Sequence, residues 1–187
     1  TRTPGEAHWV AAPAMDALVH AWAEPLAREG RLHTHTAVTR IERDPMHPTM
    51  WQLHCETLGG DTHLYTGFDA VVLAQPAPLG QALLQQSGLA APWGDALDAV
   101  EIAPCWTLML AFAHAVRPGL TTLGPQWNAA RSTHHRIAWL ARESSKPGRE
   151  PMERWTVQAS AAWSREHLQD DPARVEAKML KAFAEVT

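Results

Sequence analysis

The sequence has few cysteines and no long apolar run, and each lack excludes a class of protein. Its two cysteines among 187 residues cannot build a disulfide framework, so a reducing compartment is favoured. The longest apolar run, Cys105 to Ala113, has the length of a strand and is far short of the ~20 residues that cross a bilayer. A basic segment followed by an apolar leader is also missing. We therefore expect a cytoplasmic protein with no membrane partner.

Several catalytic and ligand-binding motifs are also missing. The sequence has no GxSxG elbow for a serine nucleophile, and neither a GxGxxG nor a Walker loop, so this chain cannot by itself cradle a pyrophosphate. His33 and His35 alternate as on one strand face, but no HExxH or CxxC element accompanies them. We interpret them as part of a solvated sheet face and expect no metal; zinc chemistry there is the weaker alternative.

The charge balance argues against a nucleic-acid partner. Lys and Arg number 16 against 20 Asp and Glu, which gives a formal net charge of −4, whereas a general nucleic-acid binder usually carries a basic excess that neutralises the phosphates. Apolar residues make up 45% and charged residues 19%, as in ordinary globular domains.

The first half of the chain predicts a helix followed by strands. A helix beginning at Pro13 carries an apolar stripe and ends at Gly30, with a kink or an early end at Pro25. A β-meander is expected over residues 31–66, with a hairpin at Gly59-Gly60. Residues 68–74 are almost continuously apolar, which predicts a strand buried on both faces.

A short helix over residues 79–86 and a linker over residues 88–98 are expected to follow. Beyond them come three strand-like segments, 99–113, 136–142 and 154–160. A last helix, capped by Asp171-Pro172, carries one apolar stripe: Val175, Met179, Phe183 and Val186. We therefore predict an α/β (α+β) chain with two domains, 1–87 (helix, β-meander and buried strand) and 88–187 with a mixed or antiparallel sheet.

Nine tryptophans stand beside three Phe and one Tyr, and four of them lie in or near the later strands. About half of these four are expected in the core, and the others could form the aromatic wall of a substrate pocket: Trp106, Trp139, Trp155 and Trp163. The polar turn 142–148 is most simply a surface hairpin; the functional interpretation makes it a cleft wall with a cationic Lys146.

Three runs of the first half and four of the second carry a resemblance to a known family. The first three are residues 8–18, Val38-Thr39-Arg40-Ile41 and residues 68–78; the others are residues 103–110, Ile137-Ala138-Trp139, residues 144–148 and residues 159–164. In their order and spacing they resemble the flavin-containing amine oxidase superfamily, and within it the bacterial branch of the renalase-like, FAD- and NAD(P)-dependent oxidoreductases.

The resemblance implies a Rossmann-type FAD domain interleaved with a substrate domain. It implies that Val38 meets the adenine through its backbone, and that Ala74, Gln75 and Pro76 form the strand end that approaches the FAD. It also implies that the pyrophosphate-binding GxGxxG element lies before Thr1, so that this chain is an internal fragment that is inactive alone and holds FAD poorly.

The chemistry implied is transfer of a hydride from a C–H next to nitrogen to flavin, which O₂ then reoxidises. A small-molecule substrate is expected, either an amine or a reduced nicotinamide. In amine-oxidising relatives a lysine assists at the flavin ring, and Lys146 is the candidate catalytic residue here. The alternative is a non-catalytic binding or interaction module on the same scaffold.

Overall fold

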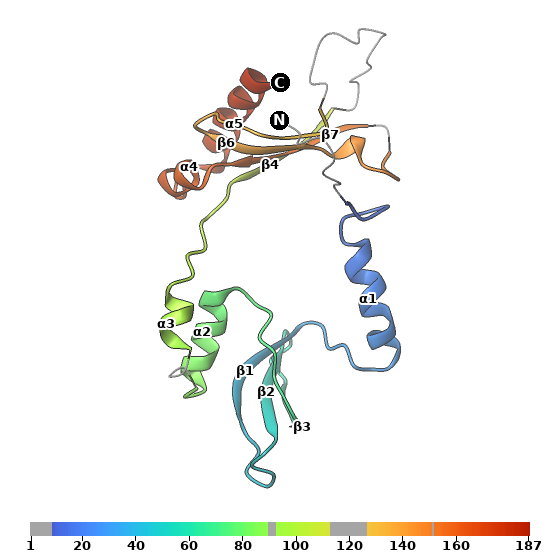
Figure 1. The fold of residues 1–187 in the computed structure, drawn as a ribbon, viewed down its shortest axis with the longest axis vertical. Coiled ribbons are helices and arrows are strands. Elements are labelled where there is room, and N and C mark those ends of the chain that lie inside the picture. The colour runs from blue at the N-terminus through green and yellow to red at the C-terminus, as the bar shows by residue number, and fades with distance from the viewer. Residues whose placement is uncertain (1–8, 90–92, 113–126, 151) are drawn as a thin grey trace. The chain divides into compact units, whose positions relative to one another are not determined.

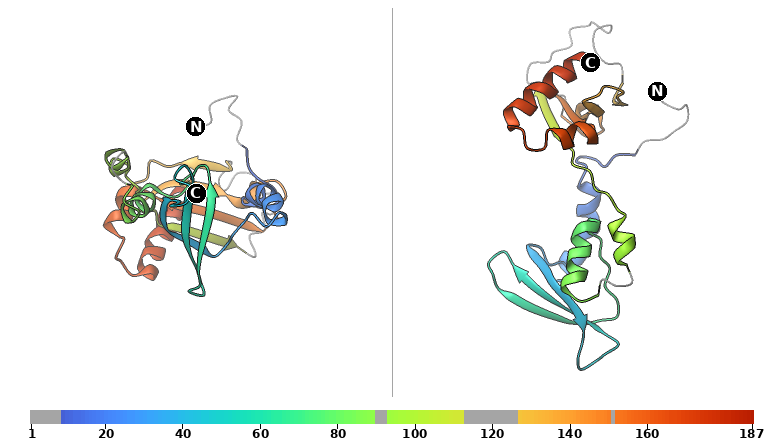
Figure 2. Two further views of the ribbon diagram at one scale, coloured as in Figure 1. Left: turned by 90° about the horizontal axis from the view of Figure 1, so that it is seen from below. Right: turned by 90° about the vertical axis from the view of Figure 1, so that its left-hand side faces the viewer.

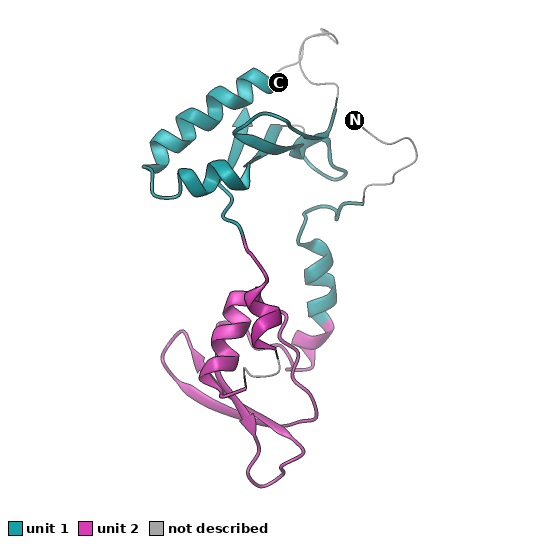
Figure 3. Ribbon diagram, turned by 60° about the vertical axis from the view of Figure 1, so that its left-hand side comes forward, with its two compact units in different colours: residues 1–24, 103–187 teal, residues 25–102 magenta. Residues whose placement is uncertain are grey.

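The computed structural model describes residues 9–89, 93–112, 127–150 and 152–187. The chain is an α+β protein, as predicted, and it divides into two compact units (Figure 3). The central unit comprises residues 25–102, and the terminal unit comprises residues 1–24 and 103–187. Each unit has its own antiparallel sheet.

The central unit is built on the predicted β-meander. Its strands β1 (Thr36–Arg43), β2 (Trp51–Thr57) and β3 (Thr62–Phe68) form an antiparallel sheet in the order β1-β2-β3 (Figure 1). The hairpin between β2 and β3 turns at Gly60, whose φ of 85° is a conformation that glycine adopts without strain. The expected strand at His33 and His35 is wrong, because β1 begins only at Thr36 and His35 has a φ of 55°.

The predicted buried strand over residues 68–74 is not formed. Strand β3 ends at Phe68, residues 70–74 have no regular secondary structure, and the side chain of Val72 is 87% exposed. A strand needs neighbours that accept and donate its backbone hydrogen bonds, and none of the described strands pairs with this segment. The apolar side chains of this segment are therefore not buried in a strand, and part of their surface is available for contact.

The central unit also contains two helices, of which the first packs against the sheet and the second packs against the first. Helix α2 (Ala77–Gln86) begins two residues before the predicted start at residue 79. It contacts β1, and Leu83 and Leu84 are buried, as are Ile41 and Cys55 of the sheet. Helix α3 (Gly94–Asp98) packs against α2, where Gln81 donates a hydrogen bond to Asp98. The predicted linker 88–98 therefore contains a helix, and the central unit extends to residue 102.

Helix α1 (Ala17–Arg28) contains the boundary between the units, which falls at Pro25. The helix continues past this proline for one turn, and it ends in a Schellman cap at Gly30 as predicted. In this cap the N–H of Gly30 donates to Ala27 and that of Arg31 to Leu26, at 3.1 and 2.8 Å. No α1 residue is buried, so its apolar stripe makes no core in the described residues.

The terminal unit is a four-stranded antiparallel sheet with two helices on one face (Figures 1 and 2). The strand order is β4-β7-β6-β5, and the strands are β4 (Thr107–Phe112), β5 (Ala129–Arg131), β6 (Ile137–Arg142) and β7 (Glu153–Ala159). A 3-10 turn, η1 (Glu143–Ser145), follows β6. Strand β5 was not expected from the sequence.

The core of the terminal unit lies between this sheet and the helices α4 (Ala161–Glu166) and α5 (Pro172–Val186). It contains the predicted α5 stripe, with Val175 and Met179 at 2% and 1% exposure. Asp171 caps α5 by accepting hydrogen bonds from the backbone of Ala173 and Arg174 at 3.0 and 3.2 Å. None of the described helices is both long and apolar enough to cross a bilayer.

Candidate functional site

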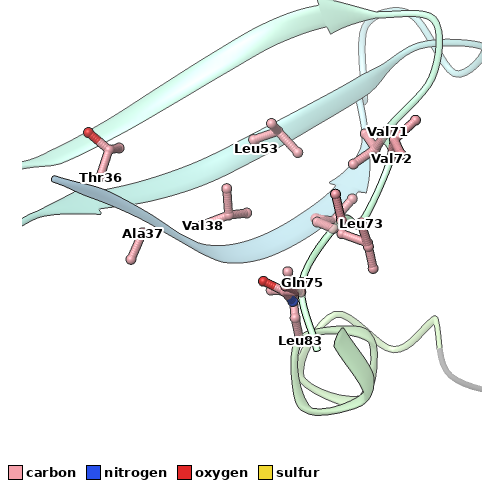
Figure 4. Close-up of a pocket in the computed structure, with 11 residues that line it drawn as sticks. Thr36, Ala37, Val38, Leu53, Val71, Val72, Leu73, Gln75 and Leu83 are labelled. Atoms are coloured by element: carbon pink, nitrogen blue, oxygen red, sulfur yellow. The ribbon is translucent and has the colours of Figure 1, made fainter. Parts of the chain in front are cut away.

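A cavity in the central unit brings together three of the four residues predicted to contact the cofactor. Val38 of β1 and Ala74 and Gln75 of the segment before α2 line the same cavity, whose volume is about 420 Å³ (Figure 4). Ligand sites are typically ~300–1,000 Å³, so the cavity is large enough for part of a ligand. Its other walls come from β1, β2, the segment before α2 and α2 itself: Thr36, Ala37, Ile41, Leu53, Val71, Val72, Leu73 and Leu83.

Strand register explains why these side chains meet. Val38 pairs with Cys55 and Ile41 pairs with Leu53, so these residues share one face of the sheet even though Val38 and Ile41 are three apart. An irregularity between Val38 and Arg40 resets the alternation and turns Ile41 to the same face. At this edge the backbone N–H of Ile41 donates to the Ser87 hydroxyl at 2.9 Å, which ties β1 to the end of α2.

The cavity is mostly aliphatic, with a few polar groups. Val38, Leu53 and Leu73 supply branched apolar walls, while Thr36 and Gln75 supply a hydroxyl and an amide. None of the described residues that line it carries a charge. Such a lining suits a flat ring with hydrogen-bonding edges and offers nothing that would neutralise a phosphate.

Pro76, the fourth predicted cofactor residue, is not in the lining. It occupies the N-cap position of α2, with φ −52° and ψ 140°. Its role in the described structure is to begin this helix directly after Gln75. The sequence reasoning missed most of the cavity walls, because Leu53 and Leu83 look like ordinary core positions of a strand and a helix.

The four tryptophans predicted to line a substrate pocket do not share a face. Trp155 and Trp163 are 3% and 5% exposed and belong to the core of the terminal unit, and Trp106 packs against that core. The Trp106 indole N–H donates to the His167 carbonyl at 3.1 Å, and the Trp163 ring stacks on His167 at 4.2 Å between centroids. The Trp106 hydrogen bond ties the residue before β4 to the C-terminal end of α4.

Trp139 lies on the opposite face of the same sheet. Ile137 pairs with Ala159 and belongs to the core, but the register shifts before Trp139, which pairs with Gln158. This bulge turns the indole away from α4 and α5. We call this side the outer face; from the strands it comprises Thr107, Met109, Ala111, Ala129, Arg131, Trp139, Ala141, Arg154, Thr156 and Gln158.

Lys146 adjoins the same outer face but is not a free cation. Its ammonium group lies 2.7 and 2.6 Å from the two carboxylate oxygens of Glu143, and its side chain is 16% exposed. Glu143 in turn accepts a hydrogen bond from the Thr156 hydroxyl at 3.1 Å. The carboxylate neutralises the lysine and holds it against the sheet, so Lys146 is a fixed, paired group.

The strongest electrostatic cluster of the terminal unit stands on the core side of the sheet. Arg142 donates to both oxygens of Glu153 at 2.7–3.1 Å, and the Trp155 indole N–H donates to the same carboxylate at 2.8 Å. Burial alone would raise the pKa of Glu153. The hydrogen bonds from Arg142 and Trp155 and the charge of Arg142 outweigh this effect and hold the pKa below its usual value. Glu153 is therefore an ionised structural anchor.

No metal centre is apparent in the described part of the chain. No group of three His, Cys, Asp or Glu side chains is placed to hold an ion among these residues. The His33 ring instead contacts Tyr65, with its Nδ1 3.2 Å from the phenol oxygen.

The chain matches the sequence profile of the family described as flavin containing amine oxidoreductase, over residues 2–185. The match spans both units and includes the cavity and the outer face. The chain belongs to this family, so a flavin cofactor, an oxidoreductase class and a small-molecule substrate follow at the level of the family.

Proposed function

We propose that this chain contributes part of the FAD-binding domain and the substrate domain of an FAD-dependent amine oxidoreductase, and that the cavity at Val38 receives the adenine end of FAD. The observation that supports this most is that Val38 lines one cavity together with Ala74 and Gln75, although more than 30 residues of sequence separate it from them. Its aliphatic walls and its single amide fit a heterocycle better than a phosphate.

A flavin bound by the protein would accept a hydride from a C–H next to nitrogen, and its reoxidation would use O₂. The residues of this chain would bind and orient the cofactor and the substrate. Val38, Leu53 and Leu73 would exclude water from the adenine, and Gln75 would offer its amide to a ring edge. On the substrate side we assign Trp139 and the Glu143–Lys146 pair, which adjoins the same face through Thr156. The Lys146 ammonium would donate a hydrogen bond to the substrate.

Titration with ADP tests the cofactor part of this proposal, because ADP carries the adenine half of FAD. We expect weak binding, on the order of millimolar, with NMR shifts at the backbone of Val38, Leu73 and Gln75. Leu53→Trp fills the cavity and should abolish these shifts. Leu64→Trp is the matched control, because Leu64 pairs with His54 on the other face of the same sheet.

The proposal fails if ADP shifts resonances elsewhere or leaves Val38 unchanged at saturating concentration. Binding of FMN, which lacks the adenine, at Val38 in preference to ADP would also contradict it. A folded protein that takes up no flavin as part of its complete chain would instead favour a non-catalytic binding module.

A further inference from the structure

We propose that the Ser87 hydroxyl sets the spacing between the β1 and α2 walls of the cavity and thereby raises its affinity for a nucleotide. Ser87 is not among the described residues that line the cavity. It is a positioning residue, which acts through Ile41 of β1 and Leu83 of α2. This inference rests on the proposed function, because it takes the adenine end of FAD as the ligand of the cavity.

One hydroxyl group is bonded to two residues that line the cavity from different elements. The backbone N–H of Ile41 donates to Ser87 Oγ at 2.9 Å, and the Ser87 hydroxyl donates to the Leu83 carbonyl at 2.7 Å. Ile41 and Leu83 are both lining residues, and Ile41 lies 46 positions before Ser87 in the sequence. The hydroxyl therefore connects two walls that come from distant parts of the chain.

The two bonds orient the hydroxyl completely. Its single proton is given to the Leu83 carbonyl, so its lone pairs remain to accept the Ile41 N–H. β1 is an edge strand of its sheet, and an N–H on the outer side of such a strand has no neighbouring strand to accept it. A side chain without a hydroxyl would lose both bonds and leave the Ile41 N–H without this partner.

The rest of the contact between α2 and the sheet is packing. In the part of the chain that the structure describes, no other hydrogen bond joins α2 and its C-cap to the three strands. At the other end of the helix, Gln75 lies beside Leu83 (Figure 4), and its Cγ is 3.9 Å from where a Cβ on Gly80 would stand. Apolar packing has no preferred direction, whereas a hydrogen bond weakens steeply when its geometry changes. Ser87 is therefore the directional link between the two walls.

A fixed spacing matters for binding, because a ligand that enters a preorganised cavity does not have to order its walls. Removing the Ser87 hydroxyl leaves every lining side chain in place but lets β1 and α2 shift relative to each other. We therefore expect weaker nucleotide binding without any loss of a direct contact to the ligand.

The test compares Ser87→Thr with Ser87→Val, which have side chains of nearly the same shape and differ in the hydroxyl. In NMR titrations with ADP, the threonine variant should bind about as well as the unmodified chain, and the valine variant about fivefold more weakly. The Ile41 amide hydrogen should exchange faster with solvent in the valine variant alone. Ser87→Ala lacks the hydroxyl and adds no methyl group, so it should repeat the loss of affinity.

Asp171→Ala is the control for a general loss of stability, because it removes the cap of α5 in the terminal unit. It should lower the urea midpoint and leave the ADP affinity unchanged. Equal ADP affinity in Ser87→Thr and Ser87→Val would overturn the role of Ser87, whatever their urea midpoints, and so would equal exchange of the Ile41 amide. If ADP leaves Val38 unshifted in the unmodified chain as well, the proposed function fails together with this inference, so the two failures are distinguishable.

Discussion

At the scale of single residues, Glu153 fastens one end of the terminal sheet. Its carboxylate accepts hydrogen bonds from the Arg142 guanidinium, the Trp155 indole and the Ser144 hydroxyl, which come from two strands and the turn η1. The Arg142 and Glu153 side chains are 18% and 13% exposed, so water can replace little of this bonding. We expect Glu153→Gln to lower the free energy of unfolding by about 1–3 kcal/mol in urea titrations.

The same residue predicts a pH dependence. Because the pKa of Glu153 is lowered in the folded chain, its stabilisation is complete above its usual pKa of 4.5 and is lost as the pH falls through the lower folded value. Unfolding free energies measured from pH 6 down should decline less steeply in Glu153→Gln. Glu176→Gln, on the exposed side of α5, should leave the slope unchanged; a slope shared by all three proteins would refute the role of Glu153.

Asp171 gives a second prediction at this scale. Its carboxylate accepts from two backbone N–H groups that the helix cannot satisfy itself. Asp171→Ala should destabilise the chain by ~1 kcal/mol, seen as a lower urea midpoint, whereas Asp171→Ser should retain most of the cap. Equal loss in both variants would show that the hydrogen bonds do not matter.

The sequence predicted the helix caps but not the sheet face on which each strand residue lies. The capping pair Asp171-Pro172 and the cap at Gly30 were readable, because each rests on a local backbone requirement. The faces of Trp139 and Ile41 were not readable, because each depends on a strand irregularity that leaves no mark in the sequence. Trp106, Trp155 and Trp163, three of the four pocket candidates, belong to the core or its edge.

At the scale of elements, the packing of α5 on the sheet carries the terminal core. Met179 is 1% exposed, whereas its neighbour Leu180 is 37% exposed on the next helix position. Met179→Ala should cost ~2–5 kcal/mol of unfolding free energy by leaving a cavity, and Leu180→Ala less than half as much. Similar losses in thermal or urea unfolding would mean that α5 does not pack as described.

Elements with a clear period were predicted, and those that depend on distant partners were not. The β-meander, α2 and α5 follow from alternation, turn residues and an apolar stripe. The three residues of β5 are too few to show a period. Residues 70–74 have the composition of a strand but lack a described partner, so the same apolar run became a cavity wall instead.

At the scale of the whole molecule, the two units take different parts of the proposed function. The central unit offers an aliphatic cavity for the adenine end of FAD, and the terminal unit carries Trp139 and the Glu143–Lys146 pair, which we assign to the substrate side. Family membership spans residues 2–185, which is the reason to interpret the two as parts of one oxidoreductase. The Rossmann-type organisation and the amine substrate remain proposals of this account.

The most direct test is to mix the flavin-loaded protein that contains this chain with a panel of small amines in the absence of O₂. We predict that at least one of these amines bleaches the visible absorbance of the oxidised flavin, and that admitting O₂ restores the colour with formation of peroxide. Flavin that stays oxidised with every amine, in a folded protein that binds it, would contradict the proposed function.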